Sequence, residues 1–341
     1  MEGAPFNFAA SSFILLGLVQ TELFLSDKEA FFRDTHAENH FFRYICSDMK
    51  RFVTLMAALA ALHGAVSAQE ATLPTPDAKT IGMGGVAMTS VSSSHAIYNN
   101  AASAVFSLTP TQISSSYYGQ GSFDYYAVSG SYRFDPSNLV QAGWRQFLRG
   151  GGNTDMAVDL GYARRLNDRW ALGIVGRYMH LSRPDVSTDA LAADLSVAYQ
   201  LPLENVGSYS TLRAGAKLAN LGAYLQEVDG ALPMDLTAGV ALDTFLSDAH
   251  EITVGADMGY YFTPKDVRGY QMSLGVEYNL MQLVQFRGGY HFGERRDYYP
   301  SYWSAGLGVR ILHIRLDFAY LFARKNTLLH DTYSLSFGFD F

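Results

Sequence analysis

One glycine cluster has the spacing of a nucleotide-binding turn. Residues 82–87 read GMGGVA, which fits the pattern G-x-G-x-x-A, where glycine lets the backbone approach a pyrophosphate closely. That chemistry needs a strand before the turn and a helix after it. Here Pro74 and Pro76 precede the cluster, and a polar run at 89–94 follows it. A turn made possible by glycine is therefore the better interpretation.

The histidines and serines form no clear catalytic or metal-binding pattern. The six histidines after residue 68 show no ligand spacing such as H-x-x-x-H. His180 and Ser182 lie close in sequence, but no G-x-S-x-G nucleophile turn occurs. The sequence therefore predicts a protein that is not an enzyme, with no catalytic residue, no cofactor and no bound metal.

The composition points away from most soluble and helical classes. Charged residues make up 17% and aromatic residues 14% of the 341 residues, which is unusual for a soluble globular domain and wrong for a disordered one. The net charge of −7 and the absence of a Lys/Arg-rich stretch argue against a nucleic-acid partner. Because no run of 18 apolar residues occurs, a helical membrane protein is also disfavoured.

Residues 49–68 have the features of a secretory signal peptide. Two basic residues, an apolar stretch of about a dozen residues and the small residues Val66–Ala68 follow Met49 in that order. We expect translation to start at Met49, with residues 1–48 an over-long gene start; a genuine cytosolic extension is the alternative. The single cysteine, Cys46, lies in that segment, so we expect the mature chain to contain no thiol.

The mature chain alternates with the period of a β-strand. In segment 170–180 one face is apolar with an aromatic residue at each end, and the other face has small residues and an arginine. Aromatic residues eight positions apart on a tilted strand span about 20 Å, close to the height of a membrane-facing band. A soluble sandwich would instead hide its large apolar face. The apolar face is therefore predicted to face lipid, and the small and ionic face an enclosed interior.

Fourteen such segments occur, and they predict an all-β fold, a 14-stranded antiparallel transmembrane β-barrel over residues 112–341. Closure is required because every backbone N–H and C=O in hydrocarbon needs an internal partner. Short and long links between segments alternate, as in outer-membrane barrels. The segments are 112–118, 125–134, 138–147, 155–166, 170–180, 189–201, 211–220, 235–245, 251–261, 270–279, 284–291, 302–310, 312–322 and 332–341.

Two groups of residues are predicted to face the lumen. The first is a set of glycines that ease strand curvature or make room inside: Gly143, Gly161, Gly173, Gly215, Gly255, Gly275, Gly289 and Gly306. The second is a set of charges, chief among them Arg177, Arg213, Asp257, Glu277, Arg315 and Asp317. These charges either line a polar pore and fix a plug, or fill the lumen as ordinary ion pairs. Their nearly balanced signs argue against strong ion selectivity.

The chain ends in an aromatic strand. Phe337, Phe339 and Phe341 share one face, with phenylalanine at the carboxyl terminus. This ending resembles that of outer-membrane proteins generally. The resemblance implies that the barrel-assembly machinery of a Gram-negative bacterium recognises the strand, and that outer-membrane lipid surrounds the protein.

Residues 77–104 resemble the head of the PorV/PorQ family of Bacteroidota barrels. Gly82, Gly84 and Gly85 stand where the family has a glycine-rich turn, and Tyr98 and Asn99 begin its second element. Asn100 replaces the usual proline there. The family is similar to the FadL group of fourteen-stranded fatty-acid channels, so the resemblance implies that residues 69–111 plug the lumen as an N-terminal hatch. It also implies type IX secretion, in which PorV binds exported cargo and passes it on.

The external loops contain the best candidates for partner contacts. Arginine and clustered aromatic residues commonly anchor protein interfaces, and packing of the loops on each other is the alternative. The predicted contacts are Tyr224, Leu225, Arg295, Arg296, Tyr298, Tyr299, Tyr302 and Trp303. Two functions remain open. One is a non-enzymatic adaptor of the PorV/PorQ type that binds secreted cargo and translocon components in a Bacteroidota outer membrane; the other is a FadL-like channel for hydrophobic small molecules.

Overall fold

The computed structural model describes residues 75–91, 94–120, 123–149, 151–183, 187–204, 206–226 and 230–341. Residues 1–48, the predicted signal peptide at 49–68 and the first residues of the predicted plug, 69–74, lie outside the described residues. In the described part of the chain, no helix has the length and apolarity needed to cross a membrane.

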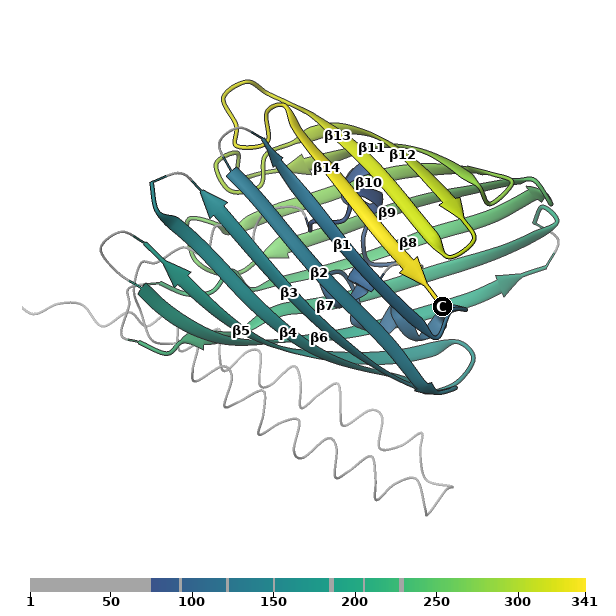
Figure 1. Ribbon diagram of the computed structural model, residues 1–341, viewed down its shortest axis with the longest axis horizontal. Helices are drawn as coiled ribbons and strands as arrows, with labels where there is room; N and C mark the ends of the chain where they lie inside the picture. Colours follow the sequence, from purple (N-terminus) through teal and green to yellow (C-terminus); the bar gives the residue numbers. More distant parts are fainter. Residues whose placement is uncertain are drawn as a thin grey trace, which may run out of the picture. The chain divides into compact units, whose positions relative to one another are not determined.

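Fourteen antiparallel strands form a closed barrel in which each strand pairs with its neighbours in sequence (Figure 1). The barrel closes where β1 pairs with β14, from Gln112 opposite Asp340 to Gly119 opposite Tyr333. The predicted 14-stranded barrel is confirmed. The strands are β1 Thr111–Gln120, β2 Phe123–Asp135, β3 Asn138–Arg149, β4 Asn153–Arg165, β5 Trp170–Ser182, β6 Ser187–Leu203, β7 Tyr209–Tyr224, β8 Asp235–Ser247, β9 His250–Tyr261, β10 Gly269–Leu280, β11 Val284–Gly293, β12 Tyr302–Ile311, β13 Ile314–Ala323 and β14 Thr332–Asp340.

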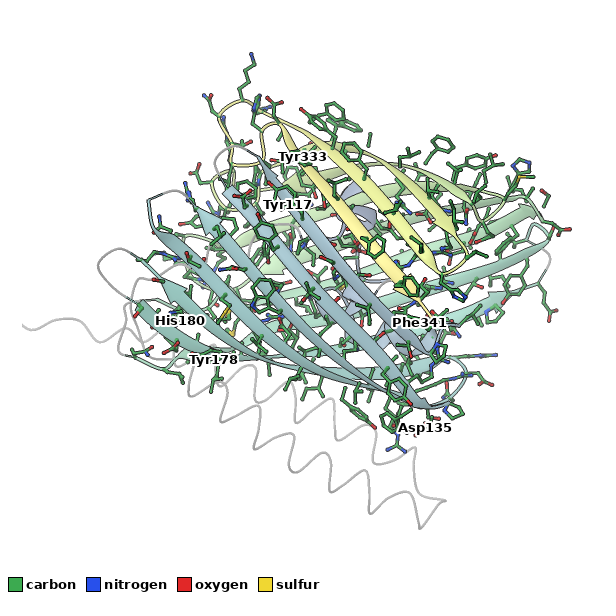
Figure 2. All side chains as sticks on the ribbon, in the orientation of Figure 1. Tyr117, Asp135, Tyr178, His180, Tyr333 and Phe341 are labelled. Atoms are coloured by element: carbon green, nitrogen blue, oxygen red, sulfur yellow. The ribbon has the colours of Figure 1, made fainter. Side chains whose placement is uncertain are left out.

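The outer surface of the barrel is apolar. On β5, Trp170, Leu172 and Ile174 are exposed, whereas Ala171 and Val175 on the opposite face are buried. Aromatic side chains from neighbouring strands meet near the two rims, and Figure 2 shows Tyr117 and Tyr333 at one rim and Phe341 at the other. Apolar side chains on the outside of a closed sheet are the arrangement that a lipid environment favours.

The connections differ from the sequence prediction at several points. At the rim that holds Phe341 the six connections are short, from two residues at 136–137 to five at 204–208. At the other rim the first two connections, 121–122 and 150–152, are equally short, because the ladders of β1–β2 and β3–β4 continue to Gln120 and Arg149. Leu312, predicted as a strand residue, lies in a turn with a φ of 54°.

A hatch, residues 75–110, lies inside the barrel. It contains α3 (Ala78–Gly82), η2 (Ser94–Ile97) and η3 (Ala101–Phe106), and the first of these begins where the Asp77 side chain accepts a hydrogen bond from the Lys79 N–H. α3 contacts β11 to β14, while η2 and η3 contact β1 to β6. The hatch therefore spans both halves of the interior.

Serine hydroxyls on the wall hold the backbone of the hatch. Ser336 Oγ accepts from the Ala78 N–H at 2.9 Å, Ser304 Oγ from the Gly84 N–H at 3.0 Å and Ser196 Oγ from the Ala102 N–H at 3.2 Å. These contacts satisfy backbone groups that no regular helix or sheet pairs. The small polar residues on the inner faces thus fix the position of the hatch.

Glycines on the wall give the hatch room to approach. Gly275 and Gly289 are opposite each other on β10 and β11. A Cβ on Gly275 would lie 2.2 Å from the Met83 carbonyl oxygen, and one on Gly289 would lie 2.3 Å from the Gly84 nitrogen. Gly84 itself has a φ of +67°, a conformation that glycine adopts without strain. At these positions the inward glycines seat the hatch backbone directly on the strands.

We predict that Gly289→Ala displaces the hatch, whereas Gly288→Ala does not. An added Cβ at 289 overlaps the hatch backbone, but one at 288 meets nothing within 4 Å. The overlap should lower the free energy of unfolding by roughly 1–3 kcal/mol and increase protease cleavage between residues 75 and 110. Urea titration and limited proteolysis of the folded barrel measure both effects. An equal free energy of unfolding and equal protease cleavage in the two variants would contradict direct contact between the hatch backbone and the strand at Gly289.

Candidate functional site

One cluster of buried charges is centred on Arg177. Its Nε donates to Asp159 Oδ1 at 2.6 Å, and its Nη2 donates to Asp194 Oδ2 at 2.8 Å. Arg145 reaches the same Asp159 carboxylate, with Nε 3.3 Å from Oδ2, and its guanidinium carbon lies 4.8 Å from the centre of the Tyr98 ring. Asp159 and Arg177 face each other in the β4–β5 register. Buried charges paired in this way avoid the cost of an isolated ion.

The other predicted lumen charges lie in separate groups. Glu277 and Asp317 both bind Arg287, and Lys79 of the hatch lies 3.7 Å from Glu277. Two further ion pairs join Arg315 to Asp340, at 2.8 Å, and Arg213 to Asp243. These charges therefore pair locally, mostly across neighbouring strands and in one case across β12, from Arg287 on β11 to Asp317 on β13. A role for these charges in lining a pore stays a prediction.

Asp257 joins the wall to the hatch. Its Oδ2 accepts hydrogen bonds from the backbone N–H groups of Ala87 at 2.6 Å and Met88 at 3.0 Å. Two adjacent N–H donors on one carboxylate oxygen form a charge-assisted contact. Of the six lumen charges predicted, Asp257 and Glu277 thus contact the hatch directly.

The predicted hatch residues occupy the middle of the barrel. Gly82, Gly84 and Gly85 form the end of α3 and the turn after it, and Gly85 has a φ of +89°. Tyr98 donates from its hydroxyl to the Val128 carbonyl oxygen at 2.8 Å, and Asn99 Nδ2 donates to Thr80 Oγ1 at 3.1 Å. Each contact holds the hatch against the wall or against itself.

His95 of the hatch lies between two serines of the wall. Its Nε2 is 2.6 Å from Ser116 Oγ, and its Nδ1 is 2.6 Å from Ser129 Oγ. Burial lowers the pKa of His95 to about 4. The imidazole is therefore neutral at physiological pH, with one nitrogen donating and the other accepting.

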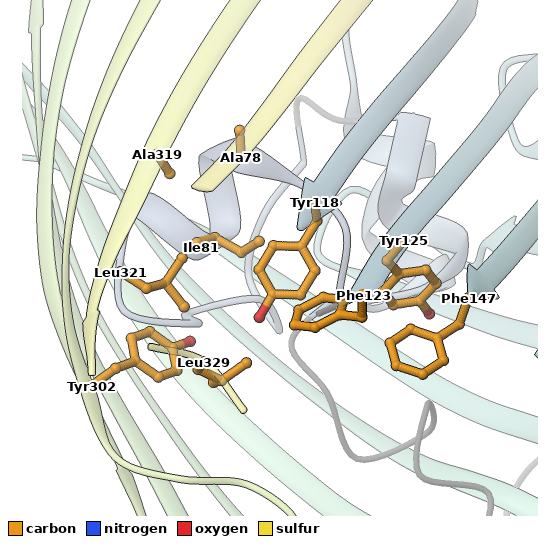
Figure 3. Packing of buried hydrophobic residues seen from close by; sticks show 10 residues of the cluster. All are labelled: Ala78, Ile81, Tyr118, Phe123, Tyr125, Phe147, Tyr302, Ala319, Leu321 and Leu329. Atoms are coloured by element: carbon orange, nitrogen blue, oxygen red, sulfur yellow. The ribbon is translucent and has the colours of Figure 1, made fainter. Parts of the chain in front are cut away.

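Four long connections fold inward and form a loop cap over the lumen, defined by Leu232, Val267, Tyr299 and Leu329. All four side chains are buried. Leu232 packs with Met179 and Leu181, and Leu329 packs with Tyr302 and Leu321, all from inner faces of the strands. Figure 3 shows Tyr302 and Leu329 close together, with the rings of Tyr118, Phe123, Tyr125 and Phe147 alongside.

Two of the residues predicted to contact a partner are buried in the structure. Tyr299 and Tyr302 are buried, because Tyr299 packs on Tyr261 at a centroid distance of 4.8 Å and Tyr302 faces inward from β12. Trp303 is exposed on the outer face beside Tyr290, where the rim meets lipid. Only some of the eight residues therefore remain on the loop surface: Leu225, Arg295 and Arg296 are exposed, and Tyr224 and Tyr298 are half-buried.

A chamber of about 140 Å³ lies between the hatch and the loop cap. Its floor includes Asn99 and Met88 of the hatch, and its roof includes Tyr299, Pro300 and Leu329. The surrounding wall is both aromatic and charged, with Tyr125, Tyr261, Tyr302, Arg145, Arg177, Lys217, Asp235 and Asp257. The chamber is the candidate functional site.

The sequence indicated some chamber residues and missed others. The alternation of β5 and β9 placed Arg177 and Asp257 inside, and the alternation of β2 and β9 could have revealed Tyr125 and Tyr261. Asn220 could not be found in this way. It has a φ of 57°, near a register shift between β6 and β7. In the described part of the chain, no group of three or more His, Cys, Asp or Glu residues could hold a metal ion.

The comparisons with known proteins concern the fold. No protein-family model matches the sequence, and no curated protein matches it. Among solved structures, the chain is similar to the CymD monoaromatic hydrocarbon channel, at 13% identity with a TM-score of 0.52, covering 79% of this chain and 97% of that one. It is also similar to the Pseudomonas putida toluene transporter TodX, at 10% identity with a TM-score of 0.52, covering 82% and 97%.

A third similar structure is a Pseudomonas aeruginosa FadL homologue, at 10% identity with a TM-score of 0.50, covering 79% of this chain and 99% of the other. At such identities the similarity establishes a FadL-like barrel fold and nothing further. The narrower resemblance to the PorV/PorQ family stays a prediction, and so does the expected lack of enzyme activity.

We predict that Asp159→Asn strongly destabilises the barrel. The substitution leaves Arg145 and Arg177 with one neutral partner in place of a shared buried carboxylate, and breaking a buried ion pair costs roughly 3–5 kcal/mol. Asp168→Asn is the matched control, because its pair with Arg165 is exposed and such pairs contribute little. Urea titrations of both variants measure the difference. Similar unfolding midpoints would contradict the structural role assigned to Asp159.

We predict that acid weakens the attachment of the hatch through His95. Because its pKa falls from about 6.5 in the unfolded chain to about 4 in the folded one, its contribution is complete above pH 6.5. It is lost as the pH falls toward 4. The unfolding midpoint should therefore fall between pH 7.5 and pH 4.5, and fall less in His95→Gln. An identical pH dependence in both proteins would show that His95 is not the responsible group.

Proposed function

We propose that the protein is a channel of a Gram-negative outer membrane that takes up small hydrophobic molecules through the luminal chamber. The observation that carries this proposal is the chamber itself, a partly aromatic space between a hatch and a loop cap in a barrel with an apolar exterior. The similar structures include a hydrocarbon channel and a toluene transporter, which support the same function. Polar and apolar groups that converge in one cavity are typical of ligand sites.

Passage requires the hatch to move, since it contacts strands on both sides of the interior. The contacts that hold it include hydrogen bonds to single serines and to Asp257, together with the Tyr98 hydroxyl on the Val128 carbonyl oxygen and the pair of Lys79 with Glu277. Such bonds contribute roughly 0.5–1.5 kcal/mol each, and more where a charge takes part. A solute that occupies the chamber could therefore exchange some of them at moderate cost.

The carboxyl-terminal strand is proposed to direct assembly of the barrel. Phe337 is exposed on the outer face of β14, and Phe341, the residue after that strand, is exposed as well. The rings of Phe339 and Phe341 lie 4.4 Å apart. β14 is also the strand that closes the barrel against β1. An aromatic edge at this position supports recognition by the barrel-assembly machinery before closure.

A second candidate is an adaptor of the PorV/PorQ type that binds type IX cargo in a Bacteroidota outer membrane. The exposed residues Leu225, Arg295 and Arg296 on the loops support it, together with the resemblance of residues 77–104. An adaptor needs rigid loops and no solute passage. The inward-folded loop cap and the similar channel structures favour the channel.

A disulfide between hatch and wall should block uptake. The Ala78 N–H lies 2.9 Å from Ser336 Oγ, so Ala78→Cys with Ser336→Cys brings two thiols within reach of each other. In cells that express the barrel, we expect oxidation to reduce uptake of radiolabelled toluene to background and a reductant to restore it. Each single-cysteine variant is the control. Uptake no greater than in cells without the barrel would overturn the proposed function, and unchanged uptake in the oxidised variant would show that the hatch does not gate it.

A further inference from the structure

An arginine interrupts the apolar outer surface of the barrel near the end of β4. Three alternate residues of this strand, Leu160, Tyr162 and Arg164, are exposed, whereas Ala163 between them is buried. Arg164 is opposite Leu172 of β5, which is exposed on the outer face. The side chain of Arg164 therefore emerges on the outer face, at the edge of the surface that faces lipid.

Arg164 lies at the level expected for lipid headgroups. It is the residue before the last one of β4, at the rim with the six short connections, where Figure 2 shows Asp135. In outer-membrane barrels the short turns face the periplasm. Trp170, two residues before Leu172, packs on Tyr199 at a centroid distance of 4.6 Å, and such aromatic residues mark the membrane–water interface. An arginine at this level keeps its stem against apolar surface and its charge among headgroups.

The polar groups beside Arg164 in the sheet are paired with one another. Asn138, opposite Arg164 on β3, donates from Nδ2 to Asp135 Oδ2 at 2.7 Å and accepts from the Tyr162 hydroxyl. Asp135 Oδ1 accepts from the N–H groups of Ser137 at 2.7 Å and of Asn138 at 2.9 Å. Asp135 attracts Arg164 electrostatically, but among the described residues the Arg164 side chain has no hydrogen bond or ion pair.

The same sector of the rim has surplus positive charge. Residues 132–138 and 162–170 contain four arginines and two aspartates, a formal charge of +2. Asp168 pairs with Arg165, whereas the side chain of Arg169 is exposed and has no partner in the described part of the chain. Basic turn residues are confined to this sector. The other connections at this rim contain no Lys or Arg: 136–137, 204–208, 248–249, 281–283 and 312–313.

We infer that this basic rim, defined by Arg164, Arg165 and Arg169, binds the headgroup of an anionic phospholipid, with the Arg164 guanidinium donating to its phosphate. A planar guanidinium matches two phosphate oxygens at once, and the acyl chains then lie along the exposed Tyr162 and Leu172. A zwitterionic headgroup brings an ammonium that the arginines repel, whereas a net negative headgroup balances their charge. This inference goes beyond the proposed function, because it concerns the lipid around the barrel and not the contents of the chamber.

The test is native mass spectrometry of the purified, folded barrel, released from detergent micelles with equal amounts of phosphatidylglycerol and phosphatidylethanolamine of the same acyl chains. We expect phosphatidylglycerol to be retained in at least about tenfold excess, since each arginine at a membrane surface favours an anionic lipid about fivefold. Equal retention of the two lipids would overturn the inference and leave an acidic protein segment as the partner of the arginines. A barrel that takes up no toluene would still show the excess, so the two proposals fail separately.

A pair of arginine variants locates the site. Arg164→Gln removes the charge at similar length and should lower the phosphatidylglycerol excess about fivefold. Arg324→Gln is the matched control, because Arg324 follows β13 at the opposite rim, is exposed and has no side-chain partner among the described residues; its excess should equal that of the parent. Equal losses in both variants would contradict the site.

Two further variants separate charge from shape. Arg164→Lys keeps the charge and should retain more of the excess than Arg164→Gln, though less than the parent, since an ammonium makes no bidentate contact. Arg164→Gln combined with Arg169→Gln should bring retention close to equal amounts of the two lipids. Heat-modifiable migration in gels checks that each variant is folded. A folded double variant with the excess of the parent would overturn the inference.

Discussion

The need to pair every backbone N–H and C=O group inside a lipid environment determines this structure. A single open edge along β1 or β14 would leave a row of unpaired groups in hydrocarbon, and the β1–β14 ladder removes it. Once the sheet is closed, each strand must present one face to lipid and one to an interior. Alternation of residue type along the chain then follows from closure, as β5 shows with Leu172 outside and Val175 inside.

Closure of the sheet also leaves a wide interior, which the hatch fills. The interior of a barrel of this size is too wide for its own side chains to fill, so either solvent or another segment must occupy it. Here the hatch does so, with its backbone against Gly275 and Gly289. Its irregular path leaves N–H groups that helices and sheets would normally pair, and Ser336, Ser304 and Asp257 accept from them. The small and polar character of the inner face thus has a structural cause independent of transport.

The sequence predicts the barrel well and the site only in part. A period of two reveals which face a residue occupies, and it correctly placed Arg177, Asp257 and Glu277 inside. It contains no information on the path of the long connections, so Tyr299 was expected on a partner-facing surface although it is buried. Tyr302 was expected there too, but it begins β12 and faces inward, which the alternation of that strand could have shown. Pair partners depend on the register between strands, which period alone does not give. The left-handed turn at Leu312 was missed for a similar reason, since alternation continues through a two-residue turn.

The similarity to hydrocarbon channels therefore concerns the fold, whereas the chemistry of the chamber concerns which molecules it binds. The fold is a way to enclose a space in a membrane, and it places few limits on what that space binds. The chamber here is lined by tyrosine rings together with Asn99 of the hatch and Asp257 of β9, whose Oδ2 accepts from the Ala87 and Met88 N–H groups. Because Asp257 both lines the chamber and accepts from the Ala87 and Met88 N–H groups, a change in the contents of the chamber acts on a residue that holds the hatch. Occupancy of the chamber and attachment of the hatch are in this way linked through one residue.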